Sequence, residues 1–175
     1  KAWRPTYPPL AGDRVVGVLG LGQLGAQSAT RLAEAGFAVR GWSRSPKDLP
    51  GIACFSGPEG LNALLDGCEI LVCLLPLTAE TDGILNKSLF ARLSQAYLIN
   101  VGRGAHLTEE DLMPALDAGH LAGVLLDVFR TEPLPADSPF WADPRIIITP
   151  HAAAVTRPQT AAVKLLDNLN RALTG

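Results

Sequence analysis

The chain has 175 residues, enough for one well-buried domain and too few for two domains of ordinary size. Hydrophobic residues make up 47% and charged residues 18%, a balance typical of a globular protein and not of a disordered one. The net charge of -2 offers no broad basic surface, so we expect no nucleic acid among its partners. The longest apolar runs, such as residues 70–77, are far shorter than the roughly 20 residues that span a bilayer, so we expect no membrane partner.

The cysteines and the N-terminal residues add two expectations. Cys54, Cys68 and Cys73 are an odd number without CxxC spacing. We interpret them as reduced thiols of a cytoplasmic protein, with Cys73 buried in a strand, and expect no metal site. Residues 1–12 are rich in proline and lack the apolar segment of a signal peptide, so they predict an extended lead-in to a single domain over residues 13–175.

An apolar run and a glycine-rich turn occupy residues 15–25, and the next ten residues have helical composition without proline or glycine. Strand, GxGxxG turn and helix in this order are the context in which the motif predicts a dinucleotide. The first glycine permits the tight turn, the second lets the backbone approach a pyrophosphate, and the third lets the helix lie close to the strand. The alternative ligand is another nucleotide, such as the adenosine of a methyl donor. The expected cofactor contacts are Gly20, Gly22, Gln23, Leu24 and Gly25.

The rest of the chain alternates between strand and helix signals. Strands are predicted within residues 38–45, 69–75, 96–104, 122–129 and 145–149, and helices near 58–67, at 86–93, from Thr108 to about 117 and at 157–173. The Thr108 hydroxyl is expected to cap its helix, ahead of an acidic first turn that suits the helix dipole. Strands separated by helices in this rhythm predict an α/β fold with a doubly wound parallel sheet, a Rossmann-type dinucleotide-binding domain.

The end of the second predicted strand indicates which dinucleotide to expect. In sheets of this kind an acidic residue there, about 20 residues beyond the glycines, binds the ribose hydroxyls of NAD. Here the sequence is Trp42-Ser43-Arg44-Ser45, without a carboxylate. Ser43, Arg44 and Ser45 would hold a 2′-phosphate by charge-assisted hydrogen bonds, so NADP, as NADPH, is favoured and NAD remains possible. In the alternative interpretation Arg44 is only a solvated loop residue.

Four sequence signals in this order resemble the D-isomer-specific 2-hydroxyacid dehydrogenase family. They are the glycine turn, NVGRG at 100–104, LLDVFRTEPLP at 125–135 and TPHAAAVTRP at 149–158. The WSRS turn and the last segment look most like the glyoxylate/hydroxypyruvate reductase A branch. The resemblance covers the chain from about residue 13 onward. It implies an NAD(P)H-dependent oxidoreductase that transfers hydride between its cofactor and a small 2-keto or 2-hydroxy acid.

The resemblance implies a catalytic set of Arg103, Glu132 and His151. Arg103 would bind the substrate carboxylate and carbonyl, Glu132 would orient the histidine and raise its basicity, and His151 would donate the proton. These roles fit the chemistry, because a 2-keto acid needs a cation for its carboxylate and a proton for the nascent alkoxide. Each residue also has a structural interpretation: Arg103 as a surface turn residue, Glu132 as part of a proline-rich loop, and His151 as a helix cap.

Further roles follow from the same resemblance. Asp127 would hold the nicotinamide carboxamide, while Leu75, Pro76 and Val101 would line the path of the cofactor. The two other histidines, His106 and His120, lack comparable neighbours in the sequence and are taken as ordinary surface residues.

Members of the family are longer and have a separate substrate lobe. The resemblance therefore implies a coenzyme domain whose substrate lobe is absent, so cofactor binding should survive but turnover by these residues alone is in question. It also implies a homodimer through the coenzyme domain, for which an exposed Phe140 and Trp141 would suit an interface, unless they pack onto their own domain. The competing function is a dinucleotide-sensing binding protein like the corepressors that resemble this family. A narrower alternative keeps the enzyme but changes its substrate to 3-phosphoglycerate or formate.

Overall fold

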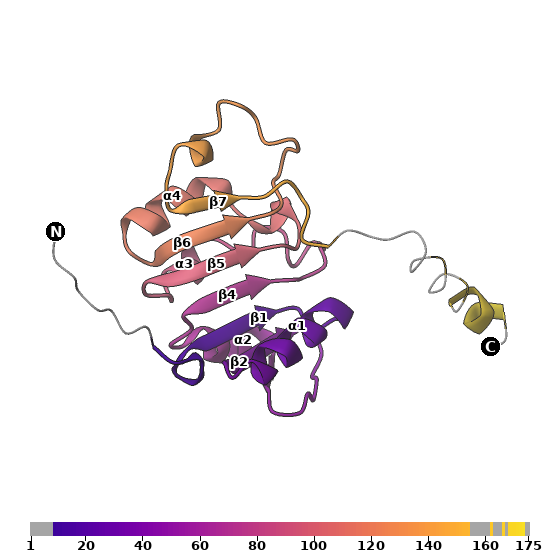
Figure 1. Cartoon of the computed structure of the whole chain (residues 1–175). Coiled ribbons are helices and arrows are strands. Elements are labelled where there is room, and N and C mark those ends of the chain that lie inside the picture. The colour runs from indigo at the N-terminus through magenta and orange to yellow at the C-terminus, as the bar shows by residue number, and fades with distance from the viewer. Residues whose placement is uncertain (1–8, 155–161, 163–165, 167, 174–175) are drawn as a thin grey trace.

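Seven parallel strands form one sheet in this computed structural model, which describes residues 9–154, 162, 166 and 168–173 (Figure 1). The strands lie in the order β3-β2-β1-β4-β5-β6-β7, so the chain winds outward from β1 in one direction and from β4 in the other. This arrangement confirms the predicted doubly wound α/β fold. In chain order the strands are β1 (Val15–Leu19), β2 (Ala38–Ser43), β3 (Ala53–Ser56), β4 (Ile70–Cys73), β5 (Ala96–Asn100), β6 (Leu121–Leu126) and β7 (Ile146–Ile148).

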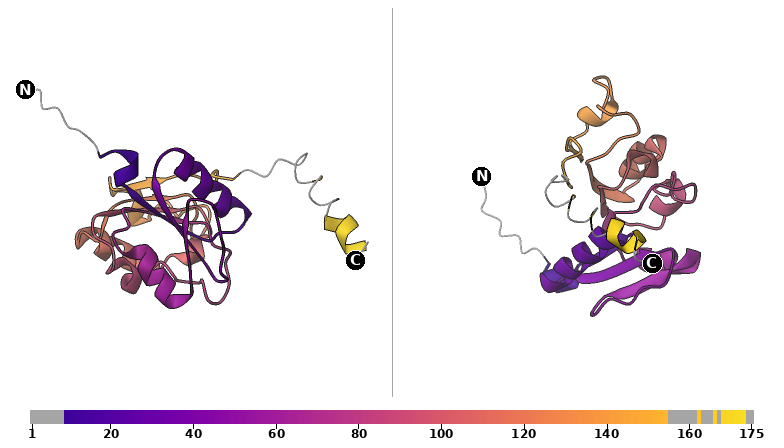
Figure 2. Two further views of the ribbon diagram at one scale, coloured as in Figure 1. Left: turned by 90° about the horizontal axis from the view of Figure 1, so that it is seen from below. Right: turned by 90° about the vertical axis from the view of Figure 1, so that its right-hand side faces the viewer.

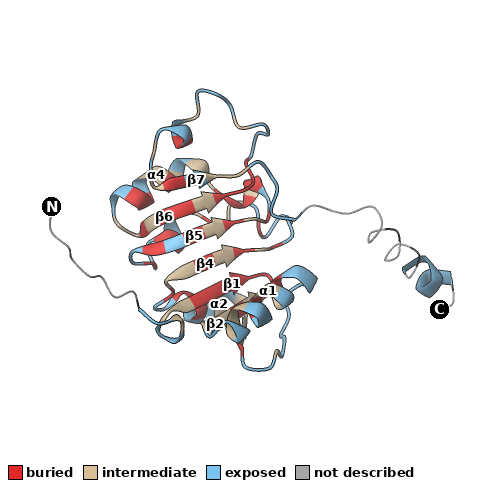
Figure 3. Ribbon diagram, viewed as in Figure 1, coloured by how far each residue is buried: buried red, intermediate tan, exposed pale blue. Residues whose placement is uncertain are grey.

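Helices cover both faces of the sheet (Figure 2). The α-helices are α1 (Gln23–Glu34), α2 (Gly57–Leu65), α3 (Lys87–Phe90) and α4 (Glu109–Asp117), and three short 3₁₀ helices are η1 (Ala11–Asp13), η2 (Gly104–His106) and η3 (Pro139–Trp141). Strand β1 supplies both cores, because its successive side chains point to opposite faces. Val16 and Val18 pack with Ala29 of α1, whereas Leu19 packs with Leu64 and the larger core under α2, α3 and α4 (Figure 3).

Burial on both faces explains why the strands consist of nearly continuous apolar residues. Cys73 of β4 is fully buried, as predicted, and burial raises the pKa of its thiol to about 12. All three cysteines are free thiols. Among the described residues, no helix is long and apolar enough to cross a bilayer.

The structure differs from the predicted elements in several places. Strand β3 was not predicted, because it is short, lies at the sheet edge and is only partly buried. The strands predicted to run through residues 104 and 129 end earlier, at Asn100 and Leu126; Gly104 begins η2, and the other residues lie in loops. Thr108 precedes α4, but its carbonyl, not its hydroxyl, accepts the Asp111 N–H at 3.0 Å. The predicted capping by the hydroxyl was therefore wrong.

Two predicted terminal segments fall largely outside the described residues. Of the lead-in at 1–12, residues 1–8 are not described, and residue 11 begins η1. Of the helix predicted at 157–173, residues 162, 166 and 168–173 are helical and the others lie outside the described part of the chain.

Candidate active site

Every residue predicted to contact cofactor or substrate lies at or just beyond the carboxyl end of a strand. Because all strands are parallel, these ends meet at one edge of the sheet, where ligands of doubly wound folds bind. The glycine turn follows β1, and the WSRS turn lies at the end of β2. The loops after β4, β5, β6 and β7 carry the remaining candidates, which are Leu75, Pro76, Val101, Arg103, Asp127, Glu132 and His151.

Each glycine after β1 is required for a different physical reason. Gly20 has a φ of +99°, and a Cβ there would lie 2.7 Å from the Leu74 carbonyl oxygen. A Cβ on Gly25 would lie 1.7 Å from the Gly20 carbonyl oxygen, so α1 can approach β1 only without a side chain. Gly22 is the N-cap of α1 and has no atom within 4 Å of its Cβ position. The open position at Gly22 beside the helix N-terminus fits a pyrophosphate.

A hollow of about 300 Å³ joins this turn to the end of β2. Arg44 and Ser45 on its wall are exposed, whereas Ser43 is largely buried and donates its hydroxyl to the Ser45 carbonyl at 2.7 Å. Arg40 lies away from the hollow and donates to carbonyls at the end of α2, so it is not available to a ligand here. The lining residues are Gly20, Leu21, Gly22, Trp42, Ser43, Arg44, Ser45, Lys47, Leu75, Pro76, Thr78, Glu80 and Thr81.

The structure brings Glu132 and His151 together across 19 positions of sequence. His151 Nδ1 lies 2.8 Å from Glu132 Oε2, and the Phe129 N–H donates to Glu132 Oε1 at 2.9 Å. Both hydrogen bonds lower the pKa of Glu132, and the one from His151 has the larger effect. Glu132 is therefore a carboxylate at neutral pH. A carboxylate can only accept, so Nδ1 of His151 carries a proton and Nε2 is left for other partners.

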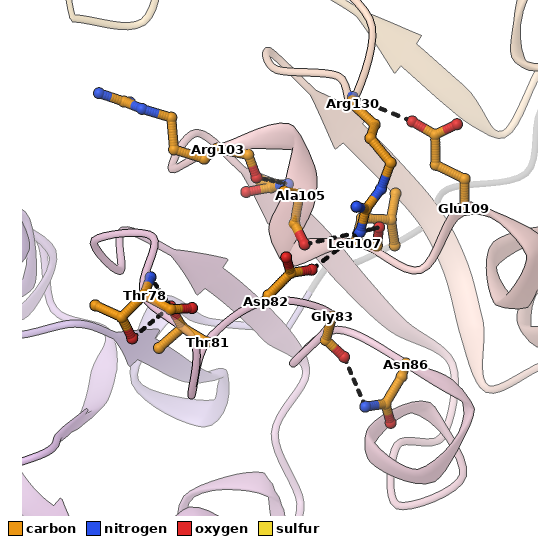
Figure 4. Close-up of polar contacts among 11 residues, drawn as sticks. Thr78, Thr81, Asp82, Gly83, Asn86, Arg103, Ala105, Leu107, Glu109 and Arg130 are labelled. Carbon is orange, nitrogen blue, oxygen red and sulfur yellow. Dashed lines mark hydrogen bonds and ion pairs between the residues drawn. The ribbon is translucent and has the colours of Figure 1, made fainter.

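The exposed residue Arg103 lies beside this pair, on the loop after β5. A hollow of about 290 Å³ is lined by Arg103, Glu132 and His151 together with Leu77, Gly104, Ala105, Phe129 and Arg130. The Arg103 guanidinium donates through Nη1 to the Gly102 carbonyl at 2.7 Å and extends away from Asp82 and Arg130 (Figure 4). The three predicted catalytic side chains therefore surround one cavity.

Asp127, at the end of β6, holds the turn that carries His151. Its side chain is 2% exposed, and its Oδ1 accepts the Thr149 hydroxyl at 2.5 Å and the Ala152 N–H at 2.8 Å. Its Oδ2 accepts the Ala153 N–H at 2.9 Å. Burial alone would raise the pKa of Asp127, but these hydrogen bonds outweigh burial and lower it. The Asp127 carbonyl also accepts the His151 N–H at 2.8 Å, and His151 has a φ of +52°.

A second cation near the site, Arg130, has a structural role that the sequence did not indicate. Its guanidinium donates to Asp82 at 3.1 Å and to the Ala105 carbonyl at 3.1 Å (Figure 4). Its backbone N–H donates to Glu109 Oε1 at 3.2 Å. Arg130 thus ties the loop that carries Glu132 to α4 and to the loop after β4.

The far side of the Glu132–His151 pair is a mostly apolar hollow of about 420 Å³, whose walls include Phe129, Leu134 and Trp141. Trp141 is 55% exposed and donates its indole N–H to the Pro135 carbonyl, while Phe140 is 4% exposed. The exposed aromatic pair expected here is therefore a single exposed Trp141, because Phe140 packs into the core.

Of the two histidines predicted to lie at the surface, the prediction was wrong for His106. His106 is not a surface residue: its side chain is fully buried, with Nδ1 accepting the Arg103 N–H at 3.0 Å. His120 is partly buried, and its Nδ1 lies 3.2 Å from the Leu93 carbonyl oxygen. Three residues after the arginine, His106 ends η2, and this turn places its ring beneath the backbone of the arginine. No group of His, Cys, Asp and Glu that could hold a metal ion occurs in the part of the chain that the structure describes.

Comparisons with known proteins identify the family of the chain. The family model described as D-isomer specific 2-hydroxyacid dehydrogenase, NAD binding domain, matches residues 2–153. Glyoxylate/hydroxypyruvate reductase A of Serratia proteamaculans is 52% identical over 168 residues, covering 95% of this chain and 54% of the relative. The same enzyme of Yersinia enterocolitica is 49% identical over 170 residues, covering 97% and 54%. The chain thus spans about half the length of these curated relatives.

Solved structures show the same similarity. A D-isomer specific 2-hydroxyacid dehydrogenase from Xanthobacter autotrophicus Py2, crystallised with NADPH and MES, superposes with a TM-score of 0.92 at 48% identity, covering 99% of this chain and 72% of that one. The NADPH-dependent glyoxylate/hydroxypyruvate reductase of Sinorhizobium meliloti, crystallised with NADP and sulfate, gives a TM-score of 0.90 at 41% identity, covering 99% and 56%.

Proposed function

Because the chain belongs to the D-isomer specific 2-hydroxyacid dehydrogenase family, as its NAD-binding domain, we propose that it is the coenzyme half of a reductase of small 2-keto acids. Glyoxylate and hydroxypyruvate are the proposed substrates, which the names of its relatives support. In this proposal residues 13–175 form the dinucleotide-binding domain and residues 1–12 lead into it.

One observation carries the proposal: Arg103, Glu132 and His151, which come from three loops, line the same cavity at the ligand-binding edge of the sheet. The glycine turn and the hollow at the end of β2 lie along the same edge. Reduction of a 2-keto acid requires a fixed cation and an imidazole hydrogen-bonded to a carboxylate, both next to the dinucleotide-binding site.

Each side chain then has a defined task. NADPH, when bound, supplies the hydride to the carbonyl carbon. Arg103 holds the substrate carboxylate and polarises the carbonyl oxygen through its planar set of donors. His151 donates the proton on Nε2 to that oxygen as it becomes an alkoxide, and Glu132 keeps Nδ1 protonated and the ring oriented. The contacts of Asp127 with Thr149, Ala152 and Ala153 keep this imidazole at the cavity, and Asp127 remains a candidate for the nicotinamide carboxamide.

The proposed cofactor preference is NADPH, with NADH as the weaker alternative. Arg44 and Ser45 are exposed beside Lys47 on the hollow at the end of β2, where a 2′-phosphate would meet two cations. We also propose contacts to the cofactor from Gln23 and Leu24 at the start of α1 and from Val101 after β5. Related structures contain NADPH or NADP, which supports this assignment.

A cytoplasmic homodimer completes the proposal. Free thiols at all three cysteines fit a reducing compartment. The exposed Trp141 on the loop before β7 is the residue we propose at the subunit contact. The net charge of -2 argues against a nucleic acid partner.

The test is NADPH oxidation by the intact gene product with glyoxylate and hydroxypyruvate as substrates. We expect turnover with both, and a lower Kd for NADPH than for NADH when this 175-residue chain is titrated with each cofactor. Cofactor binding without reduction of any keto acid by the intact gene product would instead favour the dinucleotide-sensing function. A lower Kd for NADH would contradict the role of Arg44.

A further inference from the structure

His106 has no part in the proposed chemistry, yet it is a polar side chain with no exposed surface directly beneath the loop of Arg103. Building on the proposed function, we propose that His106 is a positioning residue that fixes the backbone of Arg103 and thereby aims the guanidinium at the substrate carboxylate. The arginine touches the substrate in this account, and the histidine acts only through it.

The hydrogen bond between the two residues sets the state of the imidazole. Nδ1 of His106 accepts the Arg103 N–H at 3.0 Å, so it carries no proton of its own. The hydrogen of the neutral ring is therefore on Nε2. Burial lowers the pKa of His106, which keeps the ring neutral and this acceptor available throughout the physiological pH range.

The ring also packs tightly against the loop. A Cβ on Gly102 would lie 2.9 Å from Nδ1 and 3.0 Å from Cε1 of His106, so the imidazole lies directly against the glycine backbone. On the other side Cys73 Sγ is 3.7 Å from Nδ1. The ring thus lies between β4 and the loop after β5 and contacts both.

Asn100 completes the support of the arginine backbone. Its Nδ2 donates to the Arg103 carbonyl at 3.2 Å, and its Oδ1 accepts the Gly102 N–H at 3.2 Å. The Arg103 N–H and carbonyl are therefore both bound by buried side chains, one from His106 and one from Asn100. An exposed residue whose backbone is fixed in this way has a fixed Cα–Cβ direction, from which the side chain extends toward the site.

The unsatisfied nitrogen argues that His106 does more than fill space. Within the described residues Nε2 has no hydrogen-bond partner. The Pro76 carbonyl is close enough to act on the ring as a hydrogen-bond acceptor and to raise its pKa, but it makes no hydrogen bond of full geometry with Nε2, and it also accepts the Thr81 hydroxyl at 2.7 Å. A buried N–H without an acceptor costs free energy that a leucine of similar size would avoid. The acceptor at Nδ1 is the feature that a leucine would lack.

Three substitutions of His106 distinguish the role of its hydrogen-bond acceptor from that of its side-chain volume. In His106→Asn the Oδ1 takes the place of Nδ1 and can still accept the Arg103 N–H, whereas His106→Gln places its amide near Nε2, and His106→Leu has no acceptor. In the intact gene product we expect His106→Leu and His106→Gln to raise the KM for glyoxylate about tenfold, with the Kd for NADPH within about twofold. His106→Asn should restore the KM to within about threefold of the unmutated value.

His120→Leu is the matched control, because it removes a hydrogen-bonding histidine before β6, at the end of the sheet opposite the site. It should lower stability without changing the KM. Equal KM values for His106→Leu, His106→Asn and the unmutated protein would overturn the positioning role.

A spectroscopic measurement keeps the proposal testable if the variants do not fold or if no substrate is turned over. NMR of the 175-residue chain with ¹⁵N-labelled histidine should show His106 neutral, with the proton on Nε2, from pH 6 to pH 8. A protonated ring, or a proton on Nδ1, would overturn the proposal. If the NMR result holds and the intact gene product shows no keto-acid reduction, the proposed function fails and the hydrogen bond to Arg103 stands.

Discussion

The two halves of the ligand-binding edge are built in different ways. On the side of β1 and β2, the cradle is made of backbone: Gly20, Gly22 and Gly25 create space and a free helix N-terminus, and no buried side chain is needed. On the side of β5, β6 and β7, the site is made of side chains held by other side chains. The glycine turn should therefore be sensitive to added volume, whereas catalysis should depend on individual hydrogen bonds between side chains.

The largest effect should come from adding a methyl group to the glycine turn. In Gly25→Ala the new Cβ would lie 1.7 Å from the Gly20 carbonyl oxygen, a backbone atom that cannot move aside as a flexible side chain could. Overpacking of this kind costs about 3 kcal/mol or more, which for a domain of this size lowers the Tm by roughly 10 °C. Thermal unfolding followed by circular dichroism measures it.

Gly22→Ala is the matched control within the same motif. No atom lies within 4 Å of its Cβ position, so the Tm should stay within about 2 °C, while NADPH binding weakens because the methyl group enters the space for the pyrophosphate. Equal losses of stability in the two variants would remove the distinction between the packing glycine and the ligand glycine.

An intermediate effect is expected in the half built from side chains. In Asp127→Asn one oxygen becomes an NH₂ group, so a donor would face either the Ala153 N–H or the donors Thr149 and Ala152. Loss of hydrogen bonds to a charged group costs about 2 kcal/mol. We expect kcat of the intact gene product to fall roughly 10- to 100-fold, because the turn that carries His151 is no longer fixed.

The same variant distinguishes two roles of Asp127. Asparagine can still bind a carboxamide, so NADPH affinity measured by fluorescence titration should change little. A large loss of affinity with kcat preserved would instead assign this carboxylate to the nicotinamide.

How far these features could be predicted depends on how far apart in the sequence the contacting residues lie. The glycine turn and the WSRS turn are each a single continuous segment, so their sequences could predict the fold and the cofactor end of the site. Glu132 and His151 were named from family motifs, but their 2.8 Å contact depends on how two loops fold. The burial of His106 and the contacts of Arg130 could not be predicted, because they depend on which loops after β4, β5 and β6 pack together.

The smallest effect should lie outside both halves. Asp143 is hydrogen-bonded to the Arg145 guanidinium. These side-chain hydrogen bonds are the largest cause that lowers the pKa of Asp143 from 3.8 to about 2. A depressed carboxyl pKa stabilises the fold above pH 3.8, and this contribution is lost as the pH falls toward 2. The difference in unfolding free energy between unmutated protein and Asp143→Asn should be constant near pH 6 and should shrink below pH 4. A difference that grows in acid would contradict the assignment.

The most direct test of the division between the two halves is a paired measurement of NADPH Kd and glyoxylate kcat in the intact gene product for Arg44→Gln and His151→Ala. We predict that Arg44→Gln raises the Kd about tenfold or more and leaves kcat at saturating NADPH nearly unchanged. We predict that His151→Ala lowers kcat at least 100-fold and leaves the Kd nearly unchanged. A His151→Ala protein that reduces glyoxylate at the unmutated rate would contradict the account.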